Sequence, residues 1–328
     1  MSQHFLLSCA AKTLSLGAIF RMSDAEAEAT FCKVRWPETS GKPVCPHCGG
    51  VDAYDCRRPS GAPRFRCRAC VKDFSVTSGT LFASHKLPLR VYLAAIAIFA
   101  NEVKGKSALA MSRDLGTSYK AAFVLLHKLR EAMAEEIKGR VVGGHGAEVE
   151  IDGGYFGGYI KPANNRENRR DRRLARNQNG KRQCVVIVRA RDGRSVPAVF
   201  HSEGAALNFV RARVAKGSIV HADEAKSWDA LHAHFEMRRI NHEDAYSADG
   251  ACTNDAESYF SRLRRAEIGH YHSVAGQYLL RYAQESSWRE DHRRMSNGEQ
   301  VQRIASLAMA KKASPDFTGY WQRHVKAA

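Results

Sequence analysis

The sequence predicts a multidomain α+β protein, and three observations support this fold class. Two Cys-x2-Cys motifs stand close together near the amino-terminal end, which is typical of a small metal-bound domain. Apolar residues then recur at helical spacing over residues 87–133, and strand and helix patterns alternate from about residue 148 onward. The chain has 328 residues, of which 44% are hydrophobic and 26% charged, so two or three domains can each bury a core.

Basic residues clearly outnumber acidic ones. Lys and Arg total 51, Asp and Glu total 34, and the formal net charge is +17. Such an excess favours a polyanionic partner, most often nucleic acid. The alternative is a basic surface without a binding role. No run of about 20 apolar residues is present, so the sequence predicts no transmembrane helix; the most apolar stretch, residues 91–100, is interpreted as a buried helix.

Residues 1–24 are expected to be an amino-terminal extension. They loosely resemble a signal peptide, but a basic n-region is missing and Lys12 interrupts the apolar run. Met22 opens a more ordinary beginning, so residues 1–21 can also be a start-site artefact. The odd cysteine count, with four in paired motifs, is typical of metal binding in a reducing compartment, and we expect a cytoplasmic protein. The nine are Cys9, Cys32, Cys45, Cys48, Cys56, Cys67, Cys70, Cys184 and Cys252.

Residues 25–84 are expected to form a zinc ribbon. Each Cys-x2-Cys turn aims two sulfurs at one point, and two such turns suit tetrahedral Zn²⁺ with four thiolates. Four protein ligands leave no open position for substrate, so the zinc is expected to be structural. The alternative is two unrelated redox-active pairs, but no thioredoxin-like pattern surrounds them. The expected ligands are Cys45, Cys48, Cys67 and Cys70, with Cys56 left over.

Residues 85–140 are expected to be a helical DNA-binding segment with a helix-turn-helix layout. Gly116 breaks the helical pattern, and Thr117 or Ser118 can cap a second helix. Basic residues and His127 are expected on the polar sides of that helix, which can then enter a major groove. The alternative is an ordinary helical hairpin. The expected DNA contacts are Lys120, Lys128 and Arg130.

Residues 141–295 are expected to form an RNase H-like α/β domain, because their patterns run strand, hairpin, helix, strand and helix. Asp152 ends the first strand beside glycines, the hairpin turns at Asp192-Gly193, and Asp223 ends a later strand. Glu257 opens a long helix after a further strand at 237–242. Three carboxylates in this order can hold two Mg²⁺ or Mn²⁺ ions, which suit in-line phosphoryl transfer.

Each of the three acids also has a structural interpretation. Asp152 can be a turn residue, and Asp223 can cap a helix at "DEAKSW". Glu257 shares a helical face with Ser261 and Arg264 and can pair with either on the surface. Any one acid taken alone favours these interpretations, whereas the ordered set favours catalysis.

Residues 161–183 form a basic loop between the first two strands of this domain, with nine basic and two acidic residues. The loop is interpreted both as a solvated segment and as an arm that grips DNA phosphates. Its expected contacts are Arg169, Arg170, Arg172 and Arg173. Residues 296–328 are expected to be a tail without a chemical signal, in which "ASPDFTGYWQRH" can dock an aromatic plug.

The sequence resembles insertion-sequence transposases that have an amino-terminal zinc ribbon and a DDE catalytic domain, the ISXO-like group. The resemblance covers about residues 25–295 in family order. It rests on "RWPETSGKPVCPHCGG", "RFRCRACVKDFSVTSGTLFASHKLPLRVY", "VEIDGGYFGG", "HADEAKSW" and "TNDAESYFSRLRRAEIGHYHSVAGQYLLRYAQESSWR".

The resemblance implies a metal-dependent DNA transposase that acts on terminal inverted repeats. It implies that Asp152, Asp223 and Glu257 are the catalytic triad and that a freed 3′-hydroxyl attacks target DNA. Arg264 stands where the family commonly has lysine and is expected to contact phosphate; Asn254 fits the family's N-x-x-E pattern. Double-stranded DNA and a homodimer or larger synaptic complex are the expected partners, with the protein associated with the nucleoid. A DNA-binding regulator or an inactive copy is the alternative function, and a structure-specific nuclease is a third.

Overall fold

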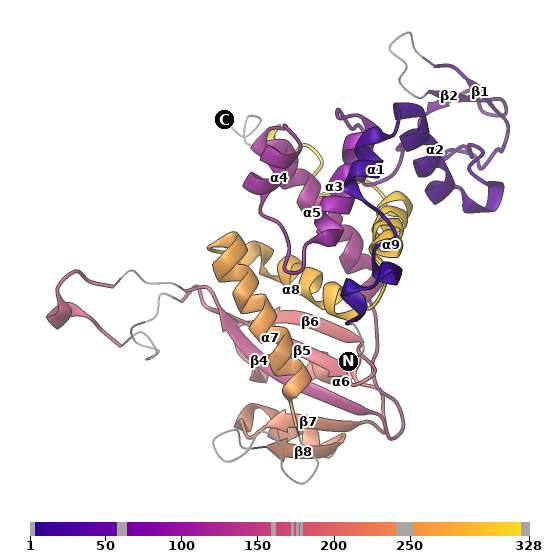
Figure 1. Cartoon of the computed structure of the whole chain (residues 1–328). Coiled ribbons are helices and arrows are strands. Elements are labelled where there is room, and N and C mark those ends of the chain that lie inside the picture. Colours follow the sequence, from indigo (N-terminus) through magenta and orange to yellow (C-terminus); the bar gives the residue numbers. More distant parts are fainter. Residues whose placement is uncertain are drawn as a thin grey trace. The chain divides into compact units, whose positions relative to one another are not determined.

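The computed structural model describes residues 4–57, 64–158, 162–171, 174, 177, 180–240 and 252–322. The chain divides into two compact units (Figure 1). Unit 1 comprises Met1–Glu136 together with His292–Ala328, and unit 2 comprises Ile137–Asp291. Helices and sheets both occur, so the expected α+β class is confirmed. The five-segment division expected from the sequence stays a prediction.

The amino-terminal segment of unit 1 is folded against its neighbours. It holds the 3-10 helices η1 (Phe5–Leu7) and η2 (Cys9–Ala11), then α1 (Leu16–Arg21) and α2 (Asp24–Arg35). Ile19 is fully buried, and the backbone N–H of Thr13 donates to Asn297 Oδ1 at 2.9 Å. Ser23 and Glu26 form a capping box that starts α2. Residues 13–21 are therefore part of the packed unit and not a loose extension.

A three-stranded antiparallel sheet follows α2 and η3 (Pro37–Thr39). Its order is β1 (Ala53–Asp55), β2 (Phe65–Cys67) and β3 (Asp73–Phe74). Residues 58–63, between β1 and β2, lie outside the described residues. Trp36 packs edge-on against Phe65 and Phe74, with ring centroids 6.2 and 6.4 Å away. This aromatic cluster gives a very small sheet a buried side.

Further α-helices of unit 1 are α3 (Leu89–Asn101), the short α4 (Ala108–Asp114), α5 (Tyr119–Ile137, whose last residue belongs to unit 2) and α9 (Asn297–Ala310). The expected turn between α4 and α5 is confirmed. Gly116 adopts φ +61°, and Ser118 Oγ accepts from the backbone N–H of Ala121 at 3.2 Å. Use of this helix pair for DNA binding stays a prediction.

The carboxy-terminal segment differs from the expected tail. Helix α9 starts with a Ser296–Glu299 capping box, and its apolar face, including Ile304 and Ala308, is buried. The chain then continues to η9 (Tyr320–Gln322). The expected aromatic plug is present, because Phe123 of α5 lies 5.7–6.4 Å from the rings of Phe317, Tyr320 and Trp321. Amphipathic periodicity in α9 thus reflects a core helix.

Unit 2 is built on a five-stranded sheet with the order β6-β5-β4-β7-β8. The strands are β4 (Glu148–Phe156), β5 (Gln183–Ala190), β6 (Ser195–Phe200), β7 (Ile219–Asp223) and β8 (Glu236–Ile240). Strands β4, β5 and β6 pair antiparallel, whereas β7 pairs parallel with both β4 and β8. The expected hairpin at Asp192-Gly193 is confirmed; residues 241–242 of the last expected strand lie outside the described residues.

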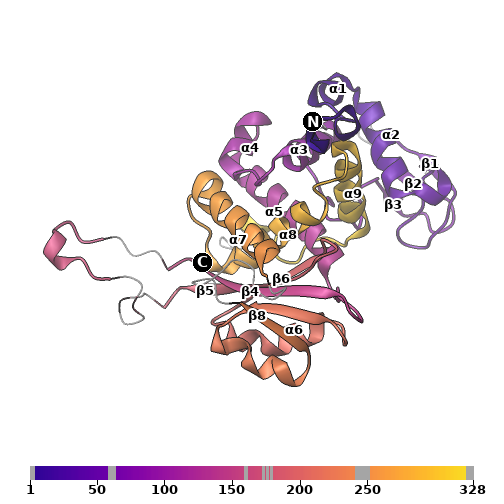
Figure 2. The same ribbon diagram turned by 60° about the horizontal axis from the view of Figure 1, so that its bottom comes forward.

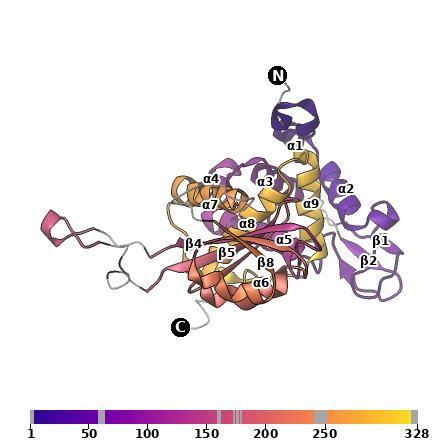
Figure 3. The same cartoon turned by 90° about the horizontal axis from the view of Figure 1, so that it is seen from below.

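Helices cover both faces of this sheet. Helices α7 (Asn254–Ala266) and α8 (Gly276–Asp291) lie on one face, joined by the π-helix η8 (Glu267–Tyr271), and α6 (Leu207–Arg213) lies on the other (Figure 2; Figure 3). Val185 and Ile187 of β5 pack with Tyr259 and Phe260 of α7 in one apolar cluster. The 3-10 helices η4 (Arg166–Asn168), η6 (Gly204–Ala206) and η7 (Lys226–Ala233) lie in the connections.

Candidate active site

Asp152 lies inside a strand and not at its end, which corrects the sequence expectation. Strand β4 continues to Phe156, with Gly153 paired to Val186 and Gly154 to Val185. Glycines fit here because neighbours fill the space beside them. A Cβ added to Gly153 would approach Glu203 Cγ to 2.4 Å, and one added to Gly154 would approach the Phe260 ring to 2.6 Å.

Asp152 and Asp223 occupy matched positions on adjacent strands. The parallel register of β4 and β7 ends with Glu150 opposite His221, and each aspartate lies two residues further along its strand. Neighbouring strands run about 4.8 Å apart, so this register brings the two carboxylates to the same place in the sheet. Asp223 Oδ1 also accepts from the backbone N–H of Ala225 at 3.2 Å, which shapes the turn after β7.

Glu257 lies in the first turn of α7, the helix that packs on β4 and β5. Alternation along β4 points Asp152 toward this helix, because Asp152 pairs with Ile187, whose side chain packs with α7. Burial raises the pKa of Asp152 to about 7, and repulsion from Asp223, Glu203 and Glu257 adds to the effect. The three acids expected from the sequence therefore gather in one electrostatic cluster.

Glu203 is a fourth acid of this cluster, and sequence reasoning missed it. It precedes η6, and its side chain lies against Gly153, on the sheet face opposite to Asp152. Burial raises the pKa of Glu203, and repulsion from Asp223 adds to this. Its only sequence signal is an acid shortly after a strand, in "FHSEGAAL". This signal does not reveal the contacts of Glu203, because its neighbours Gly153 and Ser227 come from distant segments.

Glu150, two residues before Asp152, is also a missed residue. Its side chain is 1% exposed, and its Oε2 accepts from the backbone N–H groups of Asp255 and Ala256 at 2.8 and 3.0 Å. These contacts join β4 to the first turn of α7. The only sequence signal is a charged residue within the apolar strand pattern of "VEID".

Arg264 and Ser261 follow Glu257 along α7. Arg264 is exposed, and its guanidinium lies 5.9 Å from the Phe260 ring and 6.0 Å from the Phe156 ring. Ser261 Oγ accepts from Arg265 at 2.7 Å, and Glu257 Oε1 accepts from Thr253 Oγ1 at 3.4 Å. Arg264 is thus an exposed cation about two helical turns beyond Glu257, close to the end of β4 at Phe156.

Four cysteine sulfurs form a compact group in unit 1. The Sγ atoms of Cys45, Cys48, Cys67 and Cys70 all lie within 4.8 Å of one another, a spacing that fits one tetrahedral ion. A Cβ added to Gly50 would approach the sulfurs of Cys67 and Cys48 to 3.3 and 3.4 Å, so this glycine leaves room for the group. Hydrogen bonding from the Cys70 backbone lowers the pKa of Cys67 to about 7. The set fits the expected structural zinc.

The basic residues of α5 that were expected to contact DNA differ in their exposure to solvent. Lys120 is exposed and Lys128 is partly exposed. The expectation that Arg130 and His127 lie on polar sides of α5 is wrong, because each is 1% exposed. The Arg130 guanidinium lies 5.6 Å from the Phe99 ring, and the His127 ring stacks on Phe317. The aromatic surroundings, which the helical pattern of α5 alone does not show, explain the difference.

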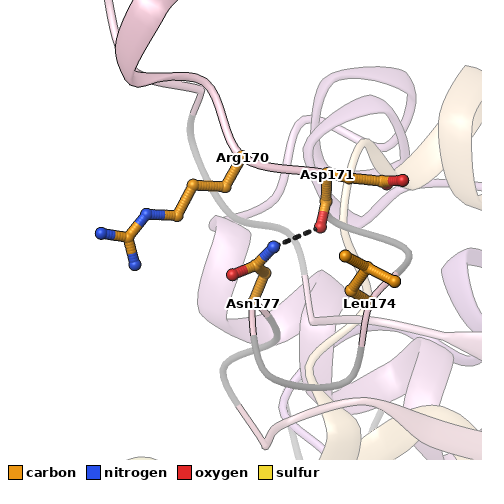
Figure 4. Close-up of a pocket in the computed structure, with 4 residues that line it drawn as sticks. All are labelled: Arg170, Asp171, Leu174 and Asn177. Atoms are coloured by element: carbon orange, nitrogen blue, oxygen red, sulfur yellow. Dashed lines mark hydrogen bonds between the residues drawn. The ribbon is translucent and has the colours of Figure 1, made fainter.

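The basic loop is described only in part. Arg169 donates to the carbonyl groups of Ala163 and Asn164, and Arg170 is exposed. Arg172 and Arg173 lie outside the described residues. A hollow in the loop is lined by Arg170, Asp171, Leu174 and Asn177, where Asn177 Nδ2 donates to the Asp171 carbonyl at 2.7 Å (Figure 4). The Arg170 side chain is exposed, so its charge is open to a partner.

One segment in each unit matches a known family. Residues 22–73 match the transposase zinc-ribbon domain, and residues 142–291 match the ISXO2-like transposase domain. The chain belongs to the insertion-sequence transposase family that carries these two domains. No match was found among curated proteins. In the described part of the chain, no helix has the length and apolar character needed to cross a membrane.

Proposed function

We propose that the protein is an active DNA transposase that binds terminal inverted repeats and catalyses metal-dependent cleavage and strand transfer. The single observation that carries this proposal is the convergence of three acids: the register of β4 and β7 aligns Asp152 with Asp223, and α7, which packs on β4, carries Glu257 in its first turn. These acids come from two adjacent strands and one covering helix within the segment that matches a transposase domain. Taken singly they have structural explanations, but carboxylates that repel one another at one place favour binding of a cation there.

The topology of unit 2 supports an RNase H-like fold for this domain. Three antiparallel strands continue into two parallel strands, and helices cover both faces. The acids stand on the central strand β4, on its parallel neighbour and on the helix above. We likewise propose that α4 and α5 act as a helix-turn-helix segment.

The chemistry of the donor set fits Mg²⁺ or Mn²⁺. Asp152, Asp223 and Glu257 offer hard carboxylate oxygens. Burial raises the pKa of Asp152, and the charges of Asp223, Glu203 and Glu257 add to this effect. Within the described residues they are not drawn together as tightly as the four cysteine sulfurs. Divalent ions, when bound, would stabilise the attacking and leaving oxygens of phosphoryl transfer.

The protein's own residues then have distinct roles. Asp152, Asp223 and Glu257 would hold the cations, and Asp152 would do so as a carboxylate, without its proton. Arg264 contacts a DNA phosphate, with which a guanidinium can form two parallel hydrogen bonds. These roles require the scissile phosphate to approach between β4 and the start of α7.

DNA binding is distributed over several elements. Lys120 and Lys128 of α5 contact one part of the duplex, and the loop arginines Arg169, Arg170, Arg172 and Arg173 neutralise further phosphates. Because transposition joins two ends to one target, we propose a homodimer or a larger synaptic complex that works at the nucleoid.

Cleavage of the DNA that flanks the gene tests the proposal. Glu257→Gln should retain DNA affinity and lose nicking by at least about a hundredfold, because the amide binds cations poorly. The exposed neighbour of Asp223, Glu224, gives the control Glu224→Gln, which should nick normally. Wild-type protein that binds these ends but cuts none of them with Mg²⁺ or Mn²⁺ would support a regulator or an inactive copy instead. Cutting without joining to target DNA would support a nuclease.

A further inference from the structure

Glu150 makes an unusual connection between a strand and a helix. Helix α7 begins at Asn254 with Thr253 as its N-cap, but the Thr253 side chain makes no capping hydrogen bond. The side chain of Glu150, on β4, caps the helix instead. Its carboxylate accepts from the backbone N–H of Asp255, 105 residues further along the chain, at 2.8 Å, and from that of Ala256 at 3.0 Å. The first amides of a helix have no partner within the helix, so this carboxyl group satisfies two of them.

The connection lies beside the acidic cluster at both of its ends. On β4, alternation places Glu150 and Asp152 on the same face of the sheet, two residues apart. On α7, Glu257 comes directly after the capped amide of Ala256. A shift of α7 along or away from β4 must therefore break these hydrogen bonds and change the separation of Asp152 and Glu257.

Other groups hold Glu150 in this orientation. Its second oxygen, Oε1, lies 3.5 Å from Arg191 Nε and 3.7 Å from Cys252 Sγ. Arg189, the partner of Glu150 across β4 and β5, is 3% exposed and lies 4.0 Å from the Asp255 carboxylate. The start of α7 thus contacts both β4 and β5. Glu150 makes the contact with β4, the strand that carries Asp152.

We propose that Glu150 is a positioning residue that sets Glu257 relative to Asp152 by capping α7 from the adjacent strand. This inference rests on the proposed function, since it assigns the capping contact a role in cation binding. Glu150 would bind neither the cations nor the DNA, because its carboxyl group already accepts from two helix amides and lies 3.5 Å from Arg191 Nε. Its contribution is to fix the positions of Asp152 and Glu257 relative to each other.

Two variants and a matched control test this role. Glu150→Leu removes both acceptors, whereas Glu150→Gln keeps the shape and one acceptor oxygen. The control is Glu148→Gln, because Glu148 lies on the same strand and face but pairs with Arg191 and Arg238 and not with α7. Hydrogen exchange of the Asp255 and Ala256 amides, the Mg²⁺ concentration that gives half-maximal nicking, the nicking rate and the DNA dissociation constant are measured for each.

For Glu150→Leu we expect at least tenfold faster exchange at the two amides and a severalfold higher half-maximal Mg²⁺ concentration. Nicking at saturating Mg²⁺ should fall by about ten- to a hundredfold, since small misplacements of catalytic groups have effects of this size. The DNA dissociation constant should stay within about twofold, and Glu150→Gln should be intermediate. Glu148→Gln should behave as wild type.

Outcomes that contradict the inference are distinct from failure of the proposed function. Folded Glu150→Leu that exchanges both amides at the wild-type rate and needs no more Mg²⁺ would overturn the positioning role. If Glu150→Leu does not fold, the same result for Glu150→Gln compared with Glu148→Gln, together with an unchanged nicking rate, would overturn it. Asp152→Ala is assayed in parallel. If Asp152→Ala nicks normally, the proposed function itself fails, whatever the Glu150 variants do; the amide exchange then still reports whether Glu150 caps α7.

Discussion

Asp152 and Asp223 stand at matched positions of two adjacent parallel strands, and the Asp152 carboxyl group is the one most affected by this arrangement. Burial raises its pKa to about 7, and Asp223 is the strongest of the three repelling acids. The unfolded chain gives an aspartate a pKa of about 3.9. At a pH between these two pKa values, the folded protein without cations therefore holds a proton that the unfolded chain releases.

The first prediction concerns stability and pH in cation-free protein. Between about pH 4 and pH 7 the folded state binds more protons than the unfolded state, so stability falls as pH rises through this window. We expect Asp152→Asn to raise the unfolding free energy at pH 8 by about 1–3 kcal/mol, a range discounted for partial exposure of the group. Urea unfolding in EDTA at pH 5 and pH 8 measures the difference, which should be much smaller at pH 5.

Stabilisation by Mg²⁺ should increase with pH, in contrast to the stability of the cation-free protein. It binds the ionised carboxylates, so millimolar Mg²⁺ should stabilise wild type more at pH 8 than at pH 5 and should not stabilise Asp152→Asn to the same extent. Glu224→Gln serves as the control because Glu224 is exposed. Equal effects of pH on wild type and Asp152→Asn would show that Asp152 titrates normally.

The second prediction concerns the fit of Glu203 against Gly153. A Cβ on Gly153 would come within 2.4 Å of Glu203 Cγ, so Gly153→Ala must displace the Glu203 side chain or the strand. We expect a loss of about 1–3 kcal/mol in unfolding free energy, as for other overpacked sites. Gly204→Ala is the control, because a Cβ on Gly204 meets no atom within 4 Å.

A double-mutant cycle identifies the cause of that loss. In a Glu203→Ala background, Gly153→Ala should cost much less, because the colliding side chain is gone. Additive losses in the double variant would mean that Gly153 is required by the backbone and not by Glu203.

The third prediction concerns the four-cysteine group. Purified protein should contain one zinc ion per chain, and Cys45→Ser should lose it together with the fold of the small sheet. Binding to transposon ends should weaken by at least about tenfold, because the ribbon is unfolded without zinc and loses the surface that would contact DNA. Cys56→Ser is the matched control, because Cys56 is outside the group. Zinc content near zero in wild type would refute the site; metal analysis and gel-shift titration measure both effects.

Local patterns predicted the parts of the protein that depend on neighbours in sequence. The paired cysteines, the hairpin at Asp192-Gly193 and the helix that begins near Glu257 all have short-range signals, and the structure places them as expected. The end of β4 was misplaced, because two glycines usually interrupt a strand. Here Glu203 and Phe260 fill the space beside them, which no local pattern shows.

Residues whose role depends on distant partners escaped prediction. Glu150 meets α7 across 105 positions, and Glu203 meets Gly153 across 50. Each looks like an ordinary acid in its own segment. Helix α9 was missed for a similar reason, since its apolar face is recognisable as core only once its partner helices are known.

Arg130 and Lys120 lie on the same helix and give the fourth prediction. The sequence suggested the same DNA-binding role for both, but Arg130 is 1% exposed beside Phe99 and Lys120 is exposed. Lys120→Ala should weaken binding to transposon ends and lower the slope of log K against log salt by about one, with unchanged stability. Arg130→Met should leave that slope unchanged and lower the unfolding free energy by about 1–3 kcal/mol, because a buried, packed cation is replaced. Binding measured at three or more salt concentrations, together with urea unfolding, separates the effects of the two variants.

A reduced salt slope in folded Arg130→Met would contradict this prediction. It would mean that the guanidinium leaves the core to reach DNA, and burial in the free protein would then describe only one of its states.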